Sequence, residues 1–432
     1  MTRPTLARTF ALLAVTTLLA AACGGNTTSP SPSASAATAA PTPAPTASPS
    51  PAGTPLPSGA ADVIFDEIEA QVLAIRGLES TEVERQTIDE DALRERTTKD
   101  FTADNPPEYI AANERLLKAL GLMPEAESLQ DLYLELLGSQ VAGFYDPDEK
   151  QLFVVSRSGT INGADKITFA HEYDHALQDA NFDVFGDHKE LLDESDQALA
   201  RAAVYEGDAT LLMILWAGPN LTPEEFAEVQ SAGSDPESLE ILSRTPSILV
   251  DGLLFPYTAG QAFVTPYQQS GGWAGVDALY ADLPLSTEQV MHPDKYQAGE
   301  KPVDVELPDV AAQIGAGWTE ELQDTFGEFQ TRTWLREVGV GGSDTSDAAA
   351  GWGGDRLAVL KGPDDAWAVV MKTAWDTAGD AGEFNDAAEI AVDAAMGNAA
   401  ILPGEGGTVR WFVVASDDDA LGKVTGAYGL AG

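Results

Sequence analysis

The chain has 432 residues, of which 44% are hydrophobic and 8% aromatic, so it is long enough for two or three domains with sizeable cores. Its 69 acidic residues outnumber 24 basic ones, and the formal net charge of -45 argues against nucleic acid as a partner, because phosphate groups would be repelled. The single cysteine, Cys23, excludes a disulfide framework within one chain.

Residues 1–22 have the features of a bacterial lipoprotein signal peptide. Arg3 and Arg8 precede an apolar run over residues 9–22, which is too short to span a bilayer comfortably. Small residues lead into Cys23, and this resembles a lipobox, in which the cysteine is lipidated and becomes the mature N-terminus. Ala20 stands where leucine is usual. The alternative is an ordinary secretory signal with an incidental cysteine.

Residues 23–60 are predicted to be a tether. After the cysteine they are almost all Ser, Thr, Pro, Ala and Gly and carry no charge, so they cannot bury apolar surface and should stay extended. A lipid anchor on Cys23 would hold the folded body at the outer face of the cytoplasmic membrane without a transmembrane helix. The sequence does not indicate an oligomeric state.

Residues 61–317 are predicted to form a mostly helical α+β domain. The spacing of apolar residues predicts helices over 61–76, 89–104, 107–138, 164–180, 195–216, 222–231, 258–270 and 273–281. A short strand is expected over 81–88. Two apolar runs over 141–145 and 151–155 flank a polar turn and predict a β-hairpin.

Residues 318–432 are predicted to form a smaller second unit. Helices are expected over 319–338 and 381–396, a loop over 343–355, and strands over 356–361, 366–373 and 409–415. Two strands, a helix and a strand favour a small two-layer α/β module.

The chemistry of the chain is concentrated in His171-Glu172-Tyr173-Asp174-His175. On a helix, His171 and His175 lie one turn apart on the same face and can bind one zinc ion (Zn2+). Glu172 can then act as general base on the zinc-bound water. Asp174 stands where a small residue is usual, so it either faces solvent or supports a ligand. The alternative for the two histidines is an accidental surface pair.

A catalytic zinc site needs a third protein ligand. Two glutamates compete, Glu194 at 19 positions and Glu206 at 31 positions after the second histidine. We favour Glu206, because it lies in an apolar helical stretch where an unpaired carboxylate would be costly to bury. Glu194 lies in an acidic run that is more typical of a solvated helix start.

These motifs resemble a family of uncharacterised bacterial secreted proteins with gluzincin-type motifs. The matching stretches are residues 140–147, 171–179, 206–209, 286–293 and 351–356. The resemblance implies a zincin-like metallopeptidase domain over 61–317 and a zinc site, but it does not imply a substrate.

Three further side chains are candidates for supporting roles. Thermolysin-like enzymes use a histidine or tyrosine to stabilise the oxyanion, and His292 could do so or bind substrate. It could equally have a structural role in the loop before Pro293. Asp179 and Asp208 could orient the imidazoles by hydrogen bonds, or could be surface acids.

The sequence therefore predicts zinc-dependent hydrolysis of a peptide bond in a peptide or protein substrate at the outer membrane face. One alternative is a zinc hydrolase that cleaves a non-peptide amide of the cell envelope. A second is a catalytically silent substrate-binding or scaffold lipoprotein, although the intact motif argues against decay. The tether alone would also suit a solute-binding transport lipoprotein, in which a zinc motif on a helix is not expected.

Overall fold

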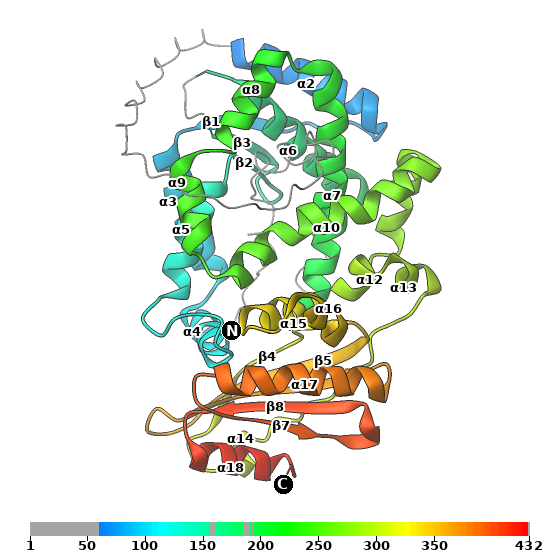
Figure 1. Cartoon of the computed structure of the whole chain (residues 1–432). Helices are drawn as coiled ribbons and strands as arrows, with labels where there is room; N and C mark the ends of the chain where they lie inside the picture. Colours follow the sequence, from blue (N-terminus) through cyan, green and yellow to red (C-terminus); the bar gives the residue numbers. More distant parts are fainter. Residues whose placement is uncertain (1–59, 156–159, 185–190, 192, 431–432) are drawn as a thin grey trace, which may run out of the picture.

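The computed structural model describes residues 60–155, 160–184, 191 and 193–430, and it is a mixed α+β protein dominated by helices, as the sequence predicts. Figure 1 shows a helical part with a small sheet at one end and a larger sheet at the other. The predicted signal peptide, Cys23 and nearly all of the tether lie outside the described residues. Within the described part, no helix is both long enough and apolar enough to cross a membrane.

The predicted hairpin is confirmed, and it belongs to a three-stranded sheet. β2 (Gly143–Asp146) pairs with β3 (Gln151–Val155) in an antiparallel manner, and β1 (Glu84–Ile88) pairs with the other side of β3 in parallel. The carboxylate of Asp146 accepts the backbone N–H groups of residues 148 and 149, which fixes the turn. Because β3 is the central strand, β2 forms one edge of this sheet.

Helix α6 (Gly163–Phe182) carries the His-Glu-x-x-His motif. A capping box opens the helix: the Asn162 side chain accepts two backbone N–H groups, and the Asp165 carboxylate accepts the N–H of Asn162. The helix ends at Phe182, and the next residue, Asp183, caps it in a left-handed conformation. Every residue from 167 to 179 is buried, so the helix is enclosed on all sides rather than amphipathic.

Two long helices, α7 (Ser195–Asn220) and α10 (Ser247–Gly271), cross the centre of the molecule and pack closely (Figure 1). A Cβ atom on Gly260 would lie 2.0 Å from the carbonyl oxygen of Ala203, and one on Gly207 would lie 2.4 Å from the carbonyl carbon of Gly260. The two backbones can approach this closely only because Gly207 and Gly260 have no side chain.

The remaining helices of this part surround α6, α7 and the small sheet. They are α2 (Ala60–Arg76), α3 (Glu90–Asp104), α4 (Pro107–Ala119), α5 (Leu129–Gln140), α8 (Pro223–Ala232), α9 (Pro236–Arg244), α11 (Trp273–Asp277), the 3-10 helix η3 (Ala278–Ala281), α12 (Thr287–Met291) and α13 (Pro293–Ala298). The predicted single helix over 107–138 is wrong, since a turn that contains Gly121 and Pro124 separates α4 from α5. Helix α10 begins eleven residues before the predicted start because it continues through Pro256.

The C-terminal part is built on a five-stranded antiparallel sheet. Its strand order is β4 (Thr319–Asp324), β5 (Trp352–Lys361), β6 (Trp367–Trp375), β8 (Val409–Ala415) and β7 (Asn398–Pro403). Its helical segments are α14 (Ala311–Ile314), α15 (Gly327–Glu337), α16 (Gly342–Ala349), α17 (Ala378–Ala394), η4 (Glu405–Gly407) and α18 (Asp418–Ala427). Figure 1 shows α17 on the face of the sheet towards the helical part and α18 on the opposite face.

Several predictions for this part are wrong. The sheet has helices on both faces, so the unit has three layers rather than two. The predicted helix over 319–338 is strand β4 followed by α15, and the predicted loop over 343–355 contains α16 and the start of β5. The sequence of β4, Thr-Glu-Glu-Leu-Gln-Asp, is rich in residues that favour helices, and only pairing with β5 makes it a strand.

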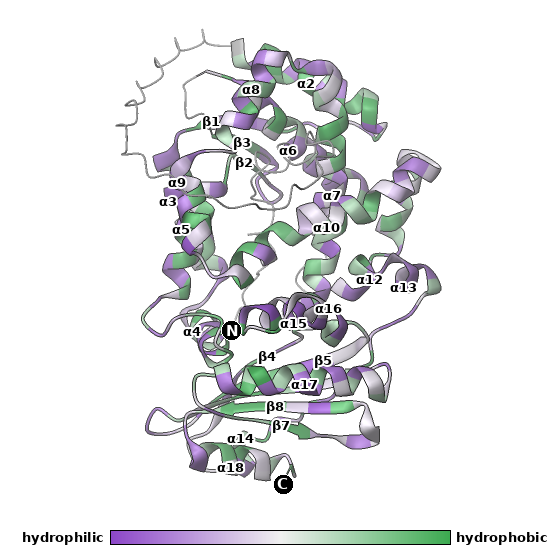
Figure 2. Cartoon of the chain, viewed as in Figure 1, coloured by the Kyte–Doolittle hydropathy of each residue, from purple (hydrophilic) through white to green (hydrophobic). Residues whose placement is uncertain are grey.

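One hydrophobic core extends across the predicted boundary at residue 318. It joins Leu116 of α4 and Leu137 of α5 to Trp334 of α15 and to Leu357 and Phe412 of the sheet. Figure 2 shows hydrophobic residues on α17 and β8, where that helix covers the sheet. The indole N–H of Trp334 also donates to a backbone carbonyl at residue 120, at 3.1 Å. The two parts of the chain are therefore packed together through a shared interior.

Candidate metal centre

The structure brings His171, His175 and Glu206 together. The Nε2 atoms of the two histidines are 3.0 Å apart, and they lie 3.0 and 3.2 Å from Oε2 of Glu206. The histidines come from α6 and the glutamate from α7, and all three side chains are buried. The three predicted ligands thus form one cluster that could hold a metal ion.

This cluster fits zinc in both donor type and geometry. Zinc ligands at about 2.0–2.1 Å in a tetrahedral arrangement lie about 3.3 Å from one another, close to the separations found here. Burial is the largest single influence on His175 and lowers its pKa, but the charge and hydrogen bond of Glu206, together with the charge of Glu172 and the hydrogen bond of Gln178, raise that pKa to about 10. Burial would raise the pKa of Glu206, yet the two histidines lower it to about 2. The centre therefore favours a positive charge between these atoms.

Gln178 determines how His175 presents its imidazole. The Gln178 side-chain N–H groups donate to the Asp174 carboxylate and to the backbone carbonyl of Tyr205, each at 3.0 Å. Its carbonyl oxygen therefore faces Nδ1 of His175, at 3.0 Å, and accepts a hydrogen bond from it. Nε2 is left to face Glu206 and His171, where a metal ion would take the place of its proton.

Asp174 is fully buried in an ion cluster rather than exposed to solvent. Arg76, the last residue of α2, contacts the carboxylates of Asp174, Asp208 and Asp277 at 3.7, 2.9 and 2.6 Å. The Tyr280 hydroxyl also donates to Asp208, at 2.6 Å. Burial and Asp208 raise the pKa of Asp174, although Arg76 opposes them. Asp174 thus supports the centre through Gln178, one of the two roles that the sequence left open.

Neither Asp179 nor Asp208 contacts an imidazole within the described part of the chain. Asp179 accepts the hydroxyl of Tyr145, at 2.8 Å, and the ammonium of Lys150, both from the hairpin. Asp208 belongs to the Arg76 cluster and is fully buried. These two carboxylates therefore fasten the hairpin and α2 to the helices of the centre.

Glu172 is fully buried beside the ligands. Its Oε2 atom accepts the backbone N–H of Tyr145 in strand β2, at 2.9 Å, whereas Oε1 has no hydrogen-bond partner among the described residues. Burial is the main cause that raises the pKa of this carboxyl group to about 8, and the charge of Glu206 adds to it. A carboxyl group with one fixed and one unpaired oxygen can accept and return a proton.

Tyr257 is a member of the centre that sequence analysis missed. It comes from α10, it is buried, and its ring stacks on His171 with 5.9 Å between ring centroids. The α7–α10 contact through Gly207 and Gly260 lies next to it along both helices. Only the tight packing of those helices brings Tyr257 to the centre, and no motif in the sequence marks that packing.

The other two candidates lie elsewhere. Glu194, at the start of α7, pairs with Arg356 at 2.9 Å and is half-exposed, so Glu206 is the glutamate that joins the histidines. His292, between α12 and α13, bonds to the buried Glu328 at 2.9 Å. Helix α12 contacts α7 near Asp196, ten residues or about 15 Å along the helix from Glu206. His292 thus packs beside the C-terminal part.

Comparison with known proteins covers only the C-terminal part. Residues 314–428 are similar to a domain of unknown function, DUF8575. This range includes all five strands of the larger sheet, but none of the residues of the metal centre. Neither the curated proteins nor the solved structures include a match. The similarity therefore carries no information about the chemistry of the chain.

Proposed function

We propose that this protein is a zinc-dependent hydrolase that cleaves peptide bonds. The observation that carries the proposal is the cluster of His171, His175 and Glu206, whose ligand atoms lie 3.0–3.2 Å from one another. Two histidines and one glutamate are a donor set of catalytic zinc sites, which leave a position open for substrate. Gln178 adds support, because it orients one imidazole for metal binding.

Zinc, when bound, would supply a Lewis acid that polarises the scissile carbonyl and lowers the pKa of water. Glu172 takes the proton of the attacking water as its oxygen adds to the carbonyl carbon. The same carboxyl group returns the proton to the amine nitrogen as the C–N bond breaks. The backbone N–H of Tyr145 holds Oε2 of Glu172 in place throughout, so that Oε1 carries out the transfer.

The proposed location is the outer face of the cytoplasmic membrane, with a lipid on Cys23 as the anchor. This proposal rests on the signal-peptide and tether composition of residues 1–60. Substrates would then be peptides or proteins that reach that face. Metabolic labelling with an alkyne fatty acid should mark the wild-type chain and not Cys23→Ser, and equal labelling would contradict the anchor.

The test of function separates zinc binding from catalysis. Purified full-length protein should contain about one zinc per chain by elemental analysis, and His171→Ala should lose it. Glu172→Gln should keep the zinc but lose peptide hydrolysis by about 1000-fold or more, because general-base catalysis is removed. Glu69→Gln, on α2, is the matched control. Hydrolysis retained in Glu172→Gln, or a folded protein that takes up no zinc, would contradict the proposal.

A further inference from the structure

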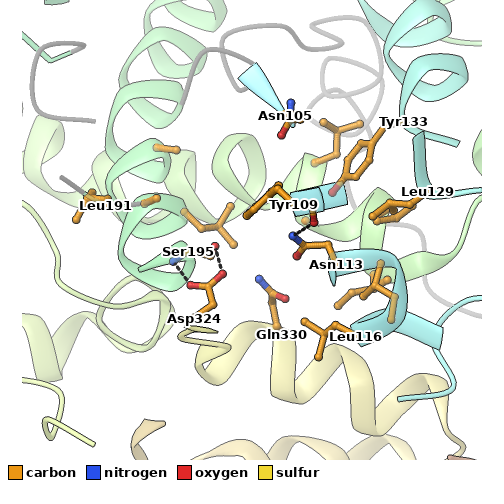
Figure 3. A pocket seen from close by; sticks show the side chains of 18 of the residues that line it. Asn105, Tyr109, Asn113, Leu116, Leu129, Tyr133, Leu191, Ser195, Asp324 and Gln330 are labelled. Carbon is orange, nitrogen blue, oxygen red and sulfur yellow. Dashed lines mark hydrogen bonds between the residues drawn. The ribbon is translucent and has the colours of Figure 1, made fainter. Parts of the chain in front are cut away.

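A cavity of about 190 Å³ adjoins the metal centre. His175 and Glu206 form part of its wall. Its other walls come from helices α3, α4, α5, α7 and α10 and from the segment between β4 and α15. Figure 3 shows side chains from these elements directed towards one space. A group bound there would touch the metal ligands at one end and the C-terminal part at the other.

The walls are mainly apolar. Side chains of this kind include Leu116, Leu129, Leu199, Ile248, Leu249 and Leu253. No lysine or arginine is among the described residues that line the cavity. A second carboxylate in the wall, that of Asp324, already accepts the backbone N–H of Ser195 at 2.8 Å (Figure 3). It also accepts the backbone N–H of Thr325 at 2.8 Å. The cavity therefore suits a neutral apolar group rather than an anion or a cation.

The volume limits the size of that group. An apolar cavity of about 150 Å³ is large enough to bind benzene. A volume of about 190 Å³ would thus take one aromatic or branched aliphatic side chain. Because the wall includes two metal ligands, that side chain must belong to a residue close to the bond that is cut.

We propose that this cavity binds a large apolar side chain, such as Phe or Leu, of the substrate residue next to the scissile bond. The inference rests on the proposed peptidase function and adds a substrate class to it. Removing such a side chain from water favours binding, whereas an alanine would leave most of the cavity unfilled. We expect a preference of about 10-fold to 200-fold for Phe or Leu over Ala at this position.

A larger side chain at position 252 would fill part of the cavity without replacing any residue of the metal centre. Gly252 lies in α10 and lines the cavity, and no atom lies within 4 Å of a Cβ placed on it. Gly252→Leu would occupy space that the substrate side chain needs. The matched control is Gly382→Leu in α17, where a Cβ also meets no atom within 4 Å, but which does not line the cavity.

The first test measures binding without turnover. Full-length Glu172→Gln protein is titrated calorimetrically, in excess zinc, with blocked peptides that differ only in one central Phe or Ala. The Phe peptide should bind at least about 10-fold more tightly. Gly252→Leu should abolish this difference and Gly382→Leu should keep it. Equal binding of the two peptides, or a preference that Gly252→Leu leaves intact, would overturn the inference.

The second test maps cleavage sites by mass spectrometry after full-length protein acts on a mixed peptide library. Large apolar residues should be enriched on one side of the cut bond, and Gly252→Leu should shift the enrichment to small residues. Cleavage without any apolar enrichment would overturn the cavity assignment alone. Selective binding of the Phe peptide with no cleavage by zinc-loaded protein would instead overturn the peptidase proposal and leave the cavity assignment supported.

Discussion

Gln178 connects the metal centre with the buried ion cluster around Arg76. Its amide spans the distance from the imidazole of His175 to the carboxylate of Asp174, which in turn faces the guanidinium. Each of these groups is buried, so a lost hydrogen bond cannot be replaced easily by water. The orientation of His175, a proposed metal ligand, therefore depends on a residue that is not part of the candidate metal centre.

We predict that Gln178→Ala weakens zinc binding by about 10-fold to 100-fold, because the His175 ring loses the acceptor that fixes its orientation. Competition with a chelator of known affinity measures this change. Gln86→Ala on strand β1 is the control, since that side chain is exposed and, among the described residues, bonds only to Gln151. Unchanged zinc affinity in Gln178→Ala would show that other contacts suffice to orient the ring.

His292 allows a pH test of its role. Its hydrogen bond with Glu328 raises its pKa, although partial burial opposes this. The ion pair then stabilises the fold fully below the ordinary histidine pKa near 6.5, and this stabilisation is lost as pH rises through the raised value. His292→Gln should thus lower Tm by on the order of 1–2 °C at pH 5.5 and by less at pH 9.

Peptide hydrolysis measured on the same His292→Gln samples distinguishes the two roles. A structural histidine predicts nearly unchanged turnover per folded, zinc-loaded chain. A loss of about 100-fold in turnover, without a pH-dependent change in Tm, would instead support the prediction that His292 stabilises the oxyanion.

The sequence could predict the three residues of the candidate metal centre because residue type and position along the chain reflect chemistry. The His171–His175 pair needs only one helix, and the preference for Glu206 followed from the cost of burying a lone carboxylate. Tyr257 and the Arg76 cluster could not be predicted, since each is brought in by an element far away in the chain.

At the level of elements, the close contact between α7 and α10 positions Glu206 and Tyr257 relative to α6. The contact depends on Gly207 and Gly260, where added side-chain atoms would meet backbone atoms of the opposite helix. Backbone atoms cannot move aside as flexible side chains do. The two helices would have to separate, which would change the position of both residues in the centre.

We predict that Gly260→Ala lowers the free energy of unfolding by about 1–3 kcal/mol, because its Cβ would lie 2.0 Å from a carbonyl oxygen. In Gly252→Ala, on the same helix, the new Cβ would have no atom within 4 Å. This substitution should instead raise the free energy of unfolding by about 0.4–1 kcal/mol. Denaturant unfolding of both variants measures the difference. Equal stability would show that α7 and α10 adjust their spacing freely.

Local signals account for most elements that the sequence predicted well. The hairpin has two apolar runs around a polar turn, and α6 has a capping box before an apolar stretch. Predictions failed where tertiary contacts outweigh propensity. Strand β4 is polar and helix-favouring but lies at the sheet edge beside β5, and α10 continues through Pro256 because it is packed against α7.

For the whole molecule, the shared core implies that the C-terminal part is required for the fold of the metal centre. Leu116 and Leu137 of the helical part pack into one cluster with Trp334 and Phe412 of the C-terminal part. Leu116 and Leu137 also line the cavity beside the centre. The pattern of predicted helices and strands suggested a boundary at residue 318, but such a pattern does not reveal whether two units share an interior.

We therefore predict that a chain ending at residue 317 does not fold cooperatively. Removal of residues 318–432 would expose the apolar faces of α4 and α5 that now pack against α15 and the sheet. Calorimetry should show no cooperative heat absorption, the dye ANS should bind, and zinc should not be retained. A chain without residues 24–59 is the control, because the sequence predicts a tether there, and it should melt like the full chain. If the chain ending at residue 317 unfolded cooperatively with a full complement of zinc, the two parts would be independent domains, and the contact through Trp334 would be a docking surface between them.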